Sequence, residues 1–191
     1  MLRLRTETGA EWLRTVLADL DGFLQDHGAN ERKASASAVL LAVHYPERRA
    51  LVDAMVELAR EELEHFAQVY AVLARRGLTL GIDSPDPYMG ALTRLMRKGH
   101  ALHFLLDRLL VFGIVEARGC ERFGILAEAL PDAELRAFYA ELTRSEARHH
   151  GLFVRLAYSI APRAEVNARL DALLDAEQVI IAELPVRAAV H

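Results

Sequence analysis

The distribution of glycine and proline constrains the fold of this chain more than any other sequence feature. Only 11 glycines and 6 prolines occur among 191 residues, and they cluster at a few positions. The long stretches between the clusters are rich in Ala, Leu, Arg and Glu, which favours the α-helix. No sustained alternation of apolar and polar residues, bounded by turn residues, indicates a β-strand. We therefore expect an all-α protein.

Apolar residues recur at helical spacing in four long segments. We predict long helices over residues 20–44, 47–76, 99–129 and 132–159, short helices over residues 9–18 and 87–97, and a last helix over residues 162–184. The core stripe of the third long helix is expected to begin with Leu102. Residues 77–87 form one long crossover loop, at whose end Asp86 is an N-cap before Pro87. Two helical hairpins joined by a crossover describe a ferritin-like four-helix bundle with extra short and C-terminal helices.

Composition narrows the class of protein. The chain is 52% hydrophobic with a formal net charge of −4, which suits a single domain over residues 1–191 and excludes a strongly basic nucleic-acid module. The one cysteine, Cys120, excludes a disulfide framework, a structural zinc ribbon and an iron site with four cysteine ligands. No segment approaches the roughly 18 apolar residues of a membrane span, and the N-terminus is charged where a signal peptide is apolar. We expect a cytoplasmic protein without membrane contacts.

Each of the four long helices carries a glutamate near the middle of its apolar stripe, and two of these glutamates are followed by a histidine three residues later. The six residues are Glu31, Glu62, His65, Glu116, Glu146 and His149. Positions i and i+3 lie on one helix face, so each Glu-x-x-His pair presents a carboxylate and an imidazole together. Inward carboxylates cost several kcal/mol each unless they are paired or bind a metal. This pattern therefore points to a bound cation.

The spacing places the four glutamates at one level. Antiparallel helices bring residues to equal height when those residues are equidistant from the turn. Glu31 and Glu62 are equidistant from the turn at Pro46, within about one residue, and Glu116 and Glu146 are equidistant from Pro131. We therefore predict that the six residues form the ligand set of a dinuclear site. Glutamate and histidine together suit iron or manganese.

Other polar residues near the apolar stripes are not included among the six predicted ligands. Rotation by about 100–200° from the ligand stripe places four of them outside it or in a supporting role. These are Glu61, Glu64, Glu121 and His150. His27 and Cys120 lie one turn from Glu31 and Glu116 and are interpreted as core residues or as lining a substrate cavity. His100 and His103 have i,i+3 spacing without matching carboxylates, which indicates packing or surface positions.

Several local strings resemble one branch of the ferritin-like superfamily, the tRNA-(2-methylthio-isopentenyladenosine) hydroxylase family. The strings are residues 26–27, 31–35, 61–66, 107–110, 114–123 and 145–149. The most specific of them is Glu-Ala-Arg-Gly-Cys-Glu-Arg-Phe, which begins at Glu116. The resemblance covers roughly residues 9–160, and the segment from about residue 162 onward matches no string of the family.

The resemblance implies that the six predicted ligands bind two irons, and that the chain is an oxygen-dependent monooxygenase. Its substrate would be the isopentenyl side chain of 2-methylthio-isopentenyladenosine in tRNA. Two electrons must then come from an external donor, a reductase or an electron-transfer protein, because a single cysteine cannot hold an iron–sulfur centre. Alternative functions for such a site are ferritin-like iron storage or detoxification, and peroxide handling.

A tRNA substrate requires cations that contact phosphates. The candidates near the crossover are Arg94, Arg97 and Lys98, and those at the first hairpin turn are Arg48 and Arg49. Arginines interspersed with acidic residues also occur on ordinary solvated helix faces. Because the net charge is close to neutral, we expect tRNA binding of modest strength that depends on salt.

Overall fold

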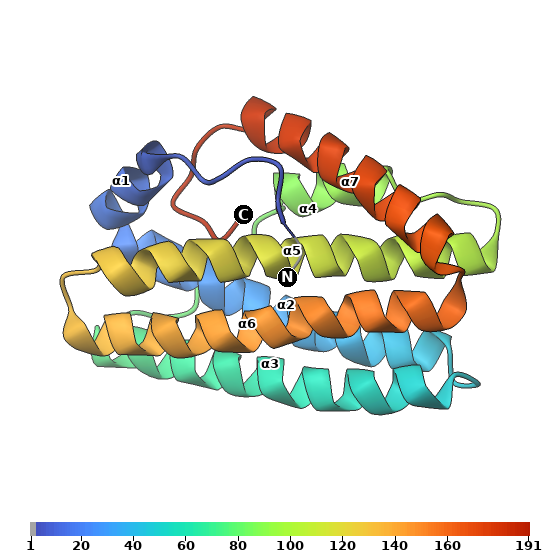
Figure 1. The fold of residues 1–191 in the computed structure, drawn as a ribbon. Helices are drawn as coiled ribbons and strands as arrows, with labels where there is room; N and C mark the ends of the chain where they lie inside the picture. The colour runs from blue at the N-terminus through green and yellow to red at the C-terminus, as the bar shows by residue number, and fades with distance from the viewer. Residues whose placement is uncertain (1–2) are drawn as a thin grey trace. The chain divides into compact units, whose positions relative to one another are not determined.

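The computed structural model describes residues 3–191, which form seven α-helices (Figure 1). They are α1 (Ala10–Ala18), α2 (Leu20–His44), α3 (Arg49–Arg75), α4 (Pro87–Arg94), α5 (Ala101–Ala129), α6 (Ala133–Ile160) and α7 (Arg163–Glu183). The chain divides into two compact units. The α2–α3 unit comprises residues 14–84 and 187–190, and the α4–α7 unit comprises the described residues up to 13, residues 85–186 and residue 191. The boundary between the two units falls within α1, after residue 13.

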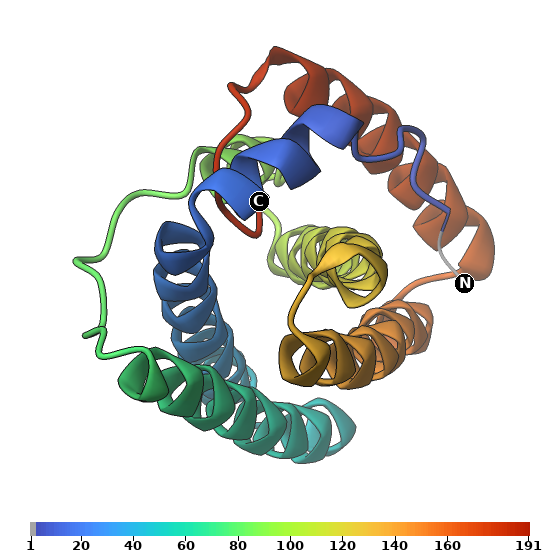
Figure 2. The ribbon, with the colours of Figure 1, turned by 90° about the vertical axis from the view of Figure 1, so that its left-hand side faces the viewer.

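The α2–α3 unit is a hairpin of two long helices that run side by side (Figures 1 and 2). Helix α2 begins where the Asp19 carboxylate accepts a hydrogen bond from the backbone N–H of Gly22 at 3.0 Å, a typical N-cap. Helix α3 ends at Arg75, and Gly77 just beyond its C-cap has a φ of +73°, which favours glycine. The N–H of Leu78 then donates to the carbonyl of Leu73 at 2.9 Å, which satisfies a terminal carbonyl of the helix.

The crossover loop is held against α2 within the same unit. The Gln25 amide donates to the Thr79 carbonyl at 2.9 Å, and the Lys33 ammonium donates to the Ser84 carbonyl at 3.3 Å. Arg32 forms an ion pair with Asp83. These contacts give the long connection a defined path along the helix.

The α4–α7 unit is built around α5, against which α6 and α7 both pack (Figure 2). Asp132 caps α6 by accepting hydrogen bonds from two backbone N–H groups of its first turn. Helices α5 and α6 approach closely at Gly113, where a Cβ would lie 3.4 Å from the Cβ of Phe153 and 3.6 Å from the carbonyl oxygen of His150. The absent side chain thus sets the spacing of this hairpin.

Two details of the sequence prediction are wrong. Helix α4 ends at Arg94 rather than at residue 97, because the backbone N–H of Arg97 donates to the Asp107 carboxylate at 2.7 Å instead of continuing the helix. Leu102, predicted to begin a core stripe, is 41% exposed because it lies in the first turn of α5. The Asp86 N-cap is confirmed: its carboxylate accepts from the N–H of Met89 at 3.0 Å.

The last helix, α7, is joined to α5 by a buried ion pair. The Glu177 carboxylate accepts from Nε and Nη2 of Arg118, at 3.0 and 2.8 Å, and from the Tyr88 hydroxyl at 3.0 Å. Arg118, Glu177 and Tyr88 are all fully buried. The second guanidinium edge of Arg118 contacts Glu121, which also accepts from the backbone N–H and hydroxyl of Thr8. These contacts give α7 a structural role, which sequence analysis had not assigned to the last helix.

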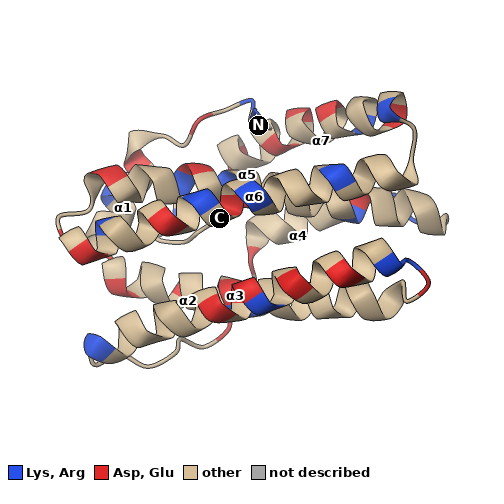
Figure 3. Cartoon of the chain, turned by 60° about the horizontal axis from the view of Figure 1, so that its bottom comes forward, with Lys and Arg blue, Asp and Glu red and all other residues tan. Residues whose placement is uncertain are grey.

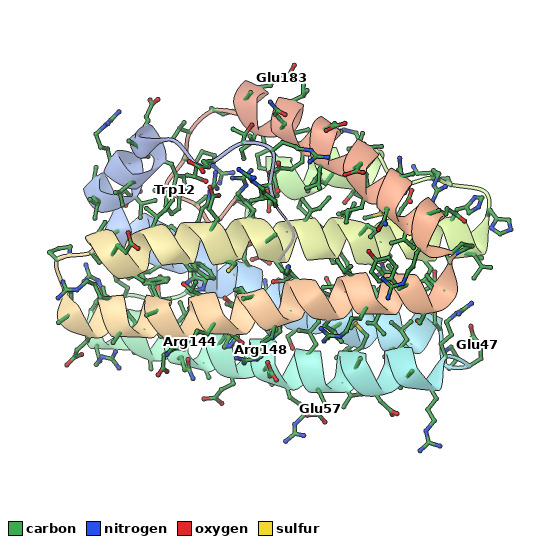
Figure 4. All side chains as sticks on the ribbon, viewed as in Figure 1. Trp12, Glu47, Glu57, Arg144, Arg148 and Glu183 are labelled. Carbon is green, nitrogen blue, oxygen red and sulfur yellow. The ribbon has the colours of Figure 1, made fainter. Side chains whose placement is uncertain are left out.

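Trp12, labelled in Figure 4, covers the other buried arginine of α5. The guanidinium of Arg122 lies over the indole ring, 4.9 Å from the ring centroid. Burial and the neighbouring charge of Arg118 lower the pKa of Arg122 to about 10. Contact with the face of an aromatic ring partly compensates such a buried cation.

We expect the Asp107→Asn substitution to lower the free energy of unfolding by about 1.5–3 kcal/mol, the range for hydrogen bonds to a charged group. Burial raises the pKa of Asp107, but hydrogen bonds from Arg169 and Arg97 outweigh it and lower the pKa below its usual value. The contribution is therefore present above the unfolded-state pKa of about 3.9, and is lost as the pH falls through the folded-state pKa. Urea unfolding of both proteins at pH 7 and pH 3 measures it. An equal difference at both pH values would contradict this account.

Candidate metal centre

The α2–α3 unit brings three of the six predicted ligands together. One ligand atom each from Glu31, Glu62 and His65 lie within 4.8 Å of one another. All three side chains are buried. Nδ1 of His65 lies 3.1 Å from Oε2 of Glu62 and 3.6 Å from Oε2 of Glu31. We call these residues the α2–α3 ligand group.

His27 supports this group from one turn earlier on α2. Its Nε2 lies 2.6 Å from Oε1 of Glu31, and its ring is fully buried. Burial raises the pKa of Glu31, but hydrogen bonds from His27 and His65 outweigh it and hold the pKa below its ordinary value. Sequence analysis placed His27 in the core without recognising this contact, which its i,i+4 spacing from Glu31 signals.

The protonation of His65 reflects the same carboxylates. Burial lowers the pKa of His65, yet hydrogen bonds to Glu31 and Glu62 raise it to about 9. In the metal-free protein the imidazolium therefore balances part of the buried negative charge at neutral pH. A metal that binds Nδ1 must displace that proton, as is general for histidine ligands.

The α4–α7 unit brings the other three predicted ligands together in the same way. Ligand atoms of Glu116, Glu146 and His149 lie within 4.8 Å of one another. Nδ1 of His149 lies 3.3 Å from Oε2 of Glu146, and both side chains are buried. We call these residues the α5–α6 ligand group. The two groups thus repeat one arrangement, in which a Glu-x-x-His pair turns Nδ1 toward its own glutamate.

The donor set of each group fits a metal ion. Two carboxylates and one imidazole, largely removed from water, form a site whose negative charge a divalent cation would neutralise. Oxygen and nitrogen donors without a thiolate suit iron or manganese rather than a structural zinc. All of these donors are carried by long α-helices, and the rigid helical backbone favours a fixed ligand geometry.

The outer face of α3 carries the carboxylates that do not belong to the ligand group. Acidic residues recur along α3 in Figure 3, and Glu57 points away from the helix in Figure 4. Glu61 and Glu64 are exposed, which confirms that they lie outside the ligand stripe. His100 and His103 are also exposed, and their rings lie 4.5 Å apart. Of the two predicted alternatives, packing or surface, the structure places these histidines at the surface.

His150 and Cys120 lie in the α5–α6 interface. His150 is only 7% exposed, although it was expected outside or in a supporting position, because the close approach at Gly113 covers this side of α6. The Cys120 thiol donates to the Thr143 carbonyl at 3.3 Å. Burial, with the charges of Glu116 and Glu121, raises the pKa of Cys120. This thiol is therefore a poor nucleophile at neutral pH.

The predicted tRNA contacts lie in both units. In the α4–α7 unit, Arg94 and Lys98 are exposed, whereas the guanidinium of Arg97 donates to Asp107. In the α2–α3 unit, Arg49 lies 3.7 Å from Asp53, and Arg48 lies 3.6 Å from Glu47. Arg97 therefore also has a structural role.

We expect His27→Ala to lower the metal affinity of the protein by about 10–100-fold, the usual cost of losing a group that orients a ligand. His27→Gln, whose amide can still donate to Glu31, should lose less. Competition with a chelator of known affinity measures both. The control is His44→Ala, at the exposed end of the same helix. Unchanged affinity in His27→Ala would show that Glu31 needs no such partner.

A solved structure resembles the whole chain. It is described as "Protein 43 with aldehyde deformylating oxygenase activity from Synechococcus", and it matches with a TM-score of 0.94 and 38% sequence identity. The match covers 100% of this chain and 96% of that chain. Together with the all-helical secondary structure of the described residues, it confirms the predicted ferritin-like four-helix fold class.

Fold and ligand groups together define a ferritin-like protein with a donor set for a dinuclear metal site. The model of one family, tRNA-(MS[2]IO[6]A)-hydroxylase (MiaE), matches residues 2–191. The chain therefore belongs to the tRNA-(MS[2]IO[6]A)-hydroxylase family.

Two curated relatives carry the name tRNA 2-(methylsulfanyl)-N(6)-isopentenyladenosine(37) hydroxylase. The protein from Pseudomonas putida is 38% identical over 170 residues, which cover 89% of this chain and 82% of the relative. The protein from Salmonella typhimurium is 37% identical over 169 residues, which cover 86% of this chain but only 62% of the relative. The chain thus spans less than two thirds of the Salmonella protein. No described helix has the length and apolar character needed to span a membrane.

Proposed function

We propose that the chain is an oxygen-dependent tRNA hydroxylase that acts on the isopentenyl side chain of 2-methylthio-isopentenyladenosine. The observation that carries this proposal is the family match over residues 2–191, in a chain that keeps both Glu-x-x-His pairs buried. The same match favours a hydroxylase over the alternatives of iron storage and peroxide handling. In the overall reaction an allylic C–H bond becomes C–OH. Dioxygen supplies that oxygen, and its second atom leaves as water after taking up two electrons and two protons.

The six predicted ligands are proposed to hold two irons, with manganese as the other metal that such donors suit. Support comes from the repeated arrangement of the α2–α3 and α5–α6 ligand groups and from the family's fold class. Two bound irons would supply the activation of dioxygen.

In this proposal the residues of the chain hold the metals, orient their ligands and keep water away from the site. Glu62 and Glu146 each lie beside the histidine of their own helix, and both pairs are buried, which keeps bulk water away. His27 holds Oε1 of Glu31, which would leave the other carboxylate oxygen available to a bound metal. In this reading the carboxylates act as ligands and not as general acids or bases.

Two further requirements follow from the proposed reaction. The electrons must come from a reductase or an electron-transfer protein, because one cysteine cannot ligate an iron–sulfur cluster. A tRNA substrate also places the enzyme in the cytoplasm. The base must leave its stack for the side chain to reach a buried metal site.

The proposal is tested with tRNA from cells that lack the hydroxylase. Iron-loaded protein, a chemical reductant and oxygen are added, and the nucleosides are analysed by mass spectrometry. We expect conversion of 2-methylthio-isopentenyladenosine to its hydroxylated form, with oxygen-18 from labelled dioxygen in the product.

Matched reactions without oxygen, and with heat-denatured protein, serve as controls. A protein that binds two irons and consumes oxygen but leaves the nucleoside unchanged would contradict the proposed substrate. Accumulation of many irons per chain under the same conditions would instead favour storage.

A further inference from the structure

Positive charge gathers at one end of the α4–α7 unit, where three segments meet. They are the loop between α4 and α5, the first turn of α5 and the beginning of α7, which lie at the same end of the unit in Figure 1. Nη2 of Arg169 donates to the Leu95 carbonyl at 2.7 Å, and Nε2 of His103 lies 3.9 Å from Oε1 of Glu165. The beginning of α7 thus touches both the loop and α5.

Asp107 is the centre of this end. Its fully buried carboxylate accepts from the backbone N–H and Nη2 of Arg97, at 2.7 and 2.8 Å, and from Nε and Nη2 of Arg169, both at 2.9 Å. One carboxylate therefore fixes two guanidinium groups and neutralises only one of them. The Arg97 and Arg169 side chains remain 34% and 20% exposed, so each keeps an edge available to a ligand.

Three exposed cations lie on neighbouring segments of the same unit. They are Arg94 at the end of α4, Lys98 in the loop and Arg163 at the start of α7. The Arg163 guanidinium lies 4.6 Å from the centroid of the Tyr158 ring, a cation–π contact. We call Arg94, Arg97, Lys98, Arg163 and Arg169 the basic end.

The charge balance of the basic end is opposite to that of the chain. Within the described part of the α4–α7 unit, Asp107 and Glu165 contact these segments, and Asp171 follows Arg169 on α7. The five cations outnumber these three carboxylates, whereas the whole chain has a formal net charge of −4. The first turns of α5 and α7 add the positive ends of two helix dipoles. Guanidinium groups held in place by a carboxylate are well suited to bind phosphates, because little side-chain entropy is lost.

We infer that the basic end binds the phosphate backbone of the tRNA at a distance from the reacting nucleoside, an inference that rests on the proposed function. Along α5, nine positions separate Asp107, which holds Arg97 and Arg169, from Glu116, which is about 14 Å. The basic end therefore cannot touch the reacting carbon, but an RNA stem is long enough to reach it. The contacts raise affinity for tRNA and leave the chemical step unchanged.

The test neutralises the exposed members of the basic end. We compare wild-type protein with the triple variant Arg94→Gln, Lys98→Gln, Arg163→Gln in direct tRNA binding from 50 to 200 mM salt. Each lost phosphate contact should reduce the slope of log affinity against log salt by about 0.7–0.9. We expect the triple variant to bind at least about tenfold more weakly at low salt, with a slope smaller by about two. In hydroxylation assays KM for tRNA should rise while kcat at saturating tRNA stays constant.

A second triple variant removes the same charge elsewhere. Arg60→Gln, Arg75→Gln, Arg144→Gln replaces exposed arginines of α3 and α6 and should keep wild-type affinity and slope. Equal weakening in both triple variants would show a general charge effect and overturn the inference, as would an unchanged slope in the first. Because binding is measured directly, its failure is distinct from a failure of tRNA hydroxylation, which would contradict the proposed function.

Discussion

Replacement of Glu116 or His149 by alanine is expected to reduce hydroxylation by about 10³-fold or more, a loss of about 4 kcal/mol in transition-state stabilisation. Both belong to the α5–α6 ligand group, and His149 is buried. Each substitution removes a proposed metal donor, which the remaining residues on their fixed helices could not replace. Iron content per chain should fall below two in both variants, as measured by elemental analysis after desalting.

The matched control is Glu64→Ala, which removes an exposed carboxylate two residues from Glu62 on α3. It should keep wild-type iron content and activity. Circular dichroism of all variants verifies that the helices are intact. Full iron occupancy in Glu116→Ala and His149→Ala would remove these residues from the ligand set.

The second large effect is expected at the buried ion pair between α5 and α7. Arg118→Met should lower the free energy of unfolding by about 3–5 kcal/mol, because it leaves the Glu177 carboxylate buried without its cation. For a chain of this length each kcal/mol shifts the melting temperature by about 2–4 °C. Thermal and urea unfolding of the purified protein measure the loss.

Two further variants separate the ion pair from simple loss of packing. The double variant Arg118→Met, Glu177→Leu replaces both charges with apolar groups and should recover much of the stability. Arg5→Ala removes the exposed ion pairs of Arg5 with Asp171 and Asp175, which lie on α7 like Glu177. This substitution should change stability little. If the double variant were no more stable than Arg118→Met, the buried charge would not explain the loss.

Most of the fold could be predicted because its signals are local. Helical periodicity and turn residues placed α2 and α6 within one residue of their observed bounds, and the Asp86-Pro87 cap marked the start of α4. The i,i+3 spacing of each Glu-x-x-His pair likewise predicts a shared helix face. The observed contacts of His65 with Glu62 and of His149 with Glu146 follow from that spacing.

The remaining features depend on contacts between distant segments, for which no local pattern exists. Arg118 and Glu177 are separated by 59 positions in the sequence, and each alone is typical of an exposed helix face. The early end of α4 depends on Asp107, which also holds Arg169 from α7. A sequence pattern reports which face of a helix is apolar, but not which buried charge on it will meet a partner.

Because each ligand group belongs to a single helical hairpin, its assembly is a local event in folding. Glu31, Glu62 and His65 meet when α2 closes on α3, and Glu116, Glu146 and His149 meet when α5 closes on α6. Such hairpins have low contact order and form quickly compared with pairings between remote segments. Each closing hairpin therefore gathers like charges, and in the α2–α3 ligand group a proton on His65, whose pKa the neighbouring carboxylates raise to about 9, offsets part of them. Binding of the proposed metals would then exchange such a proton for a cation.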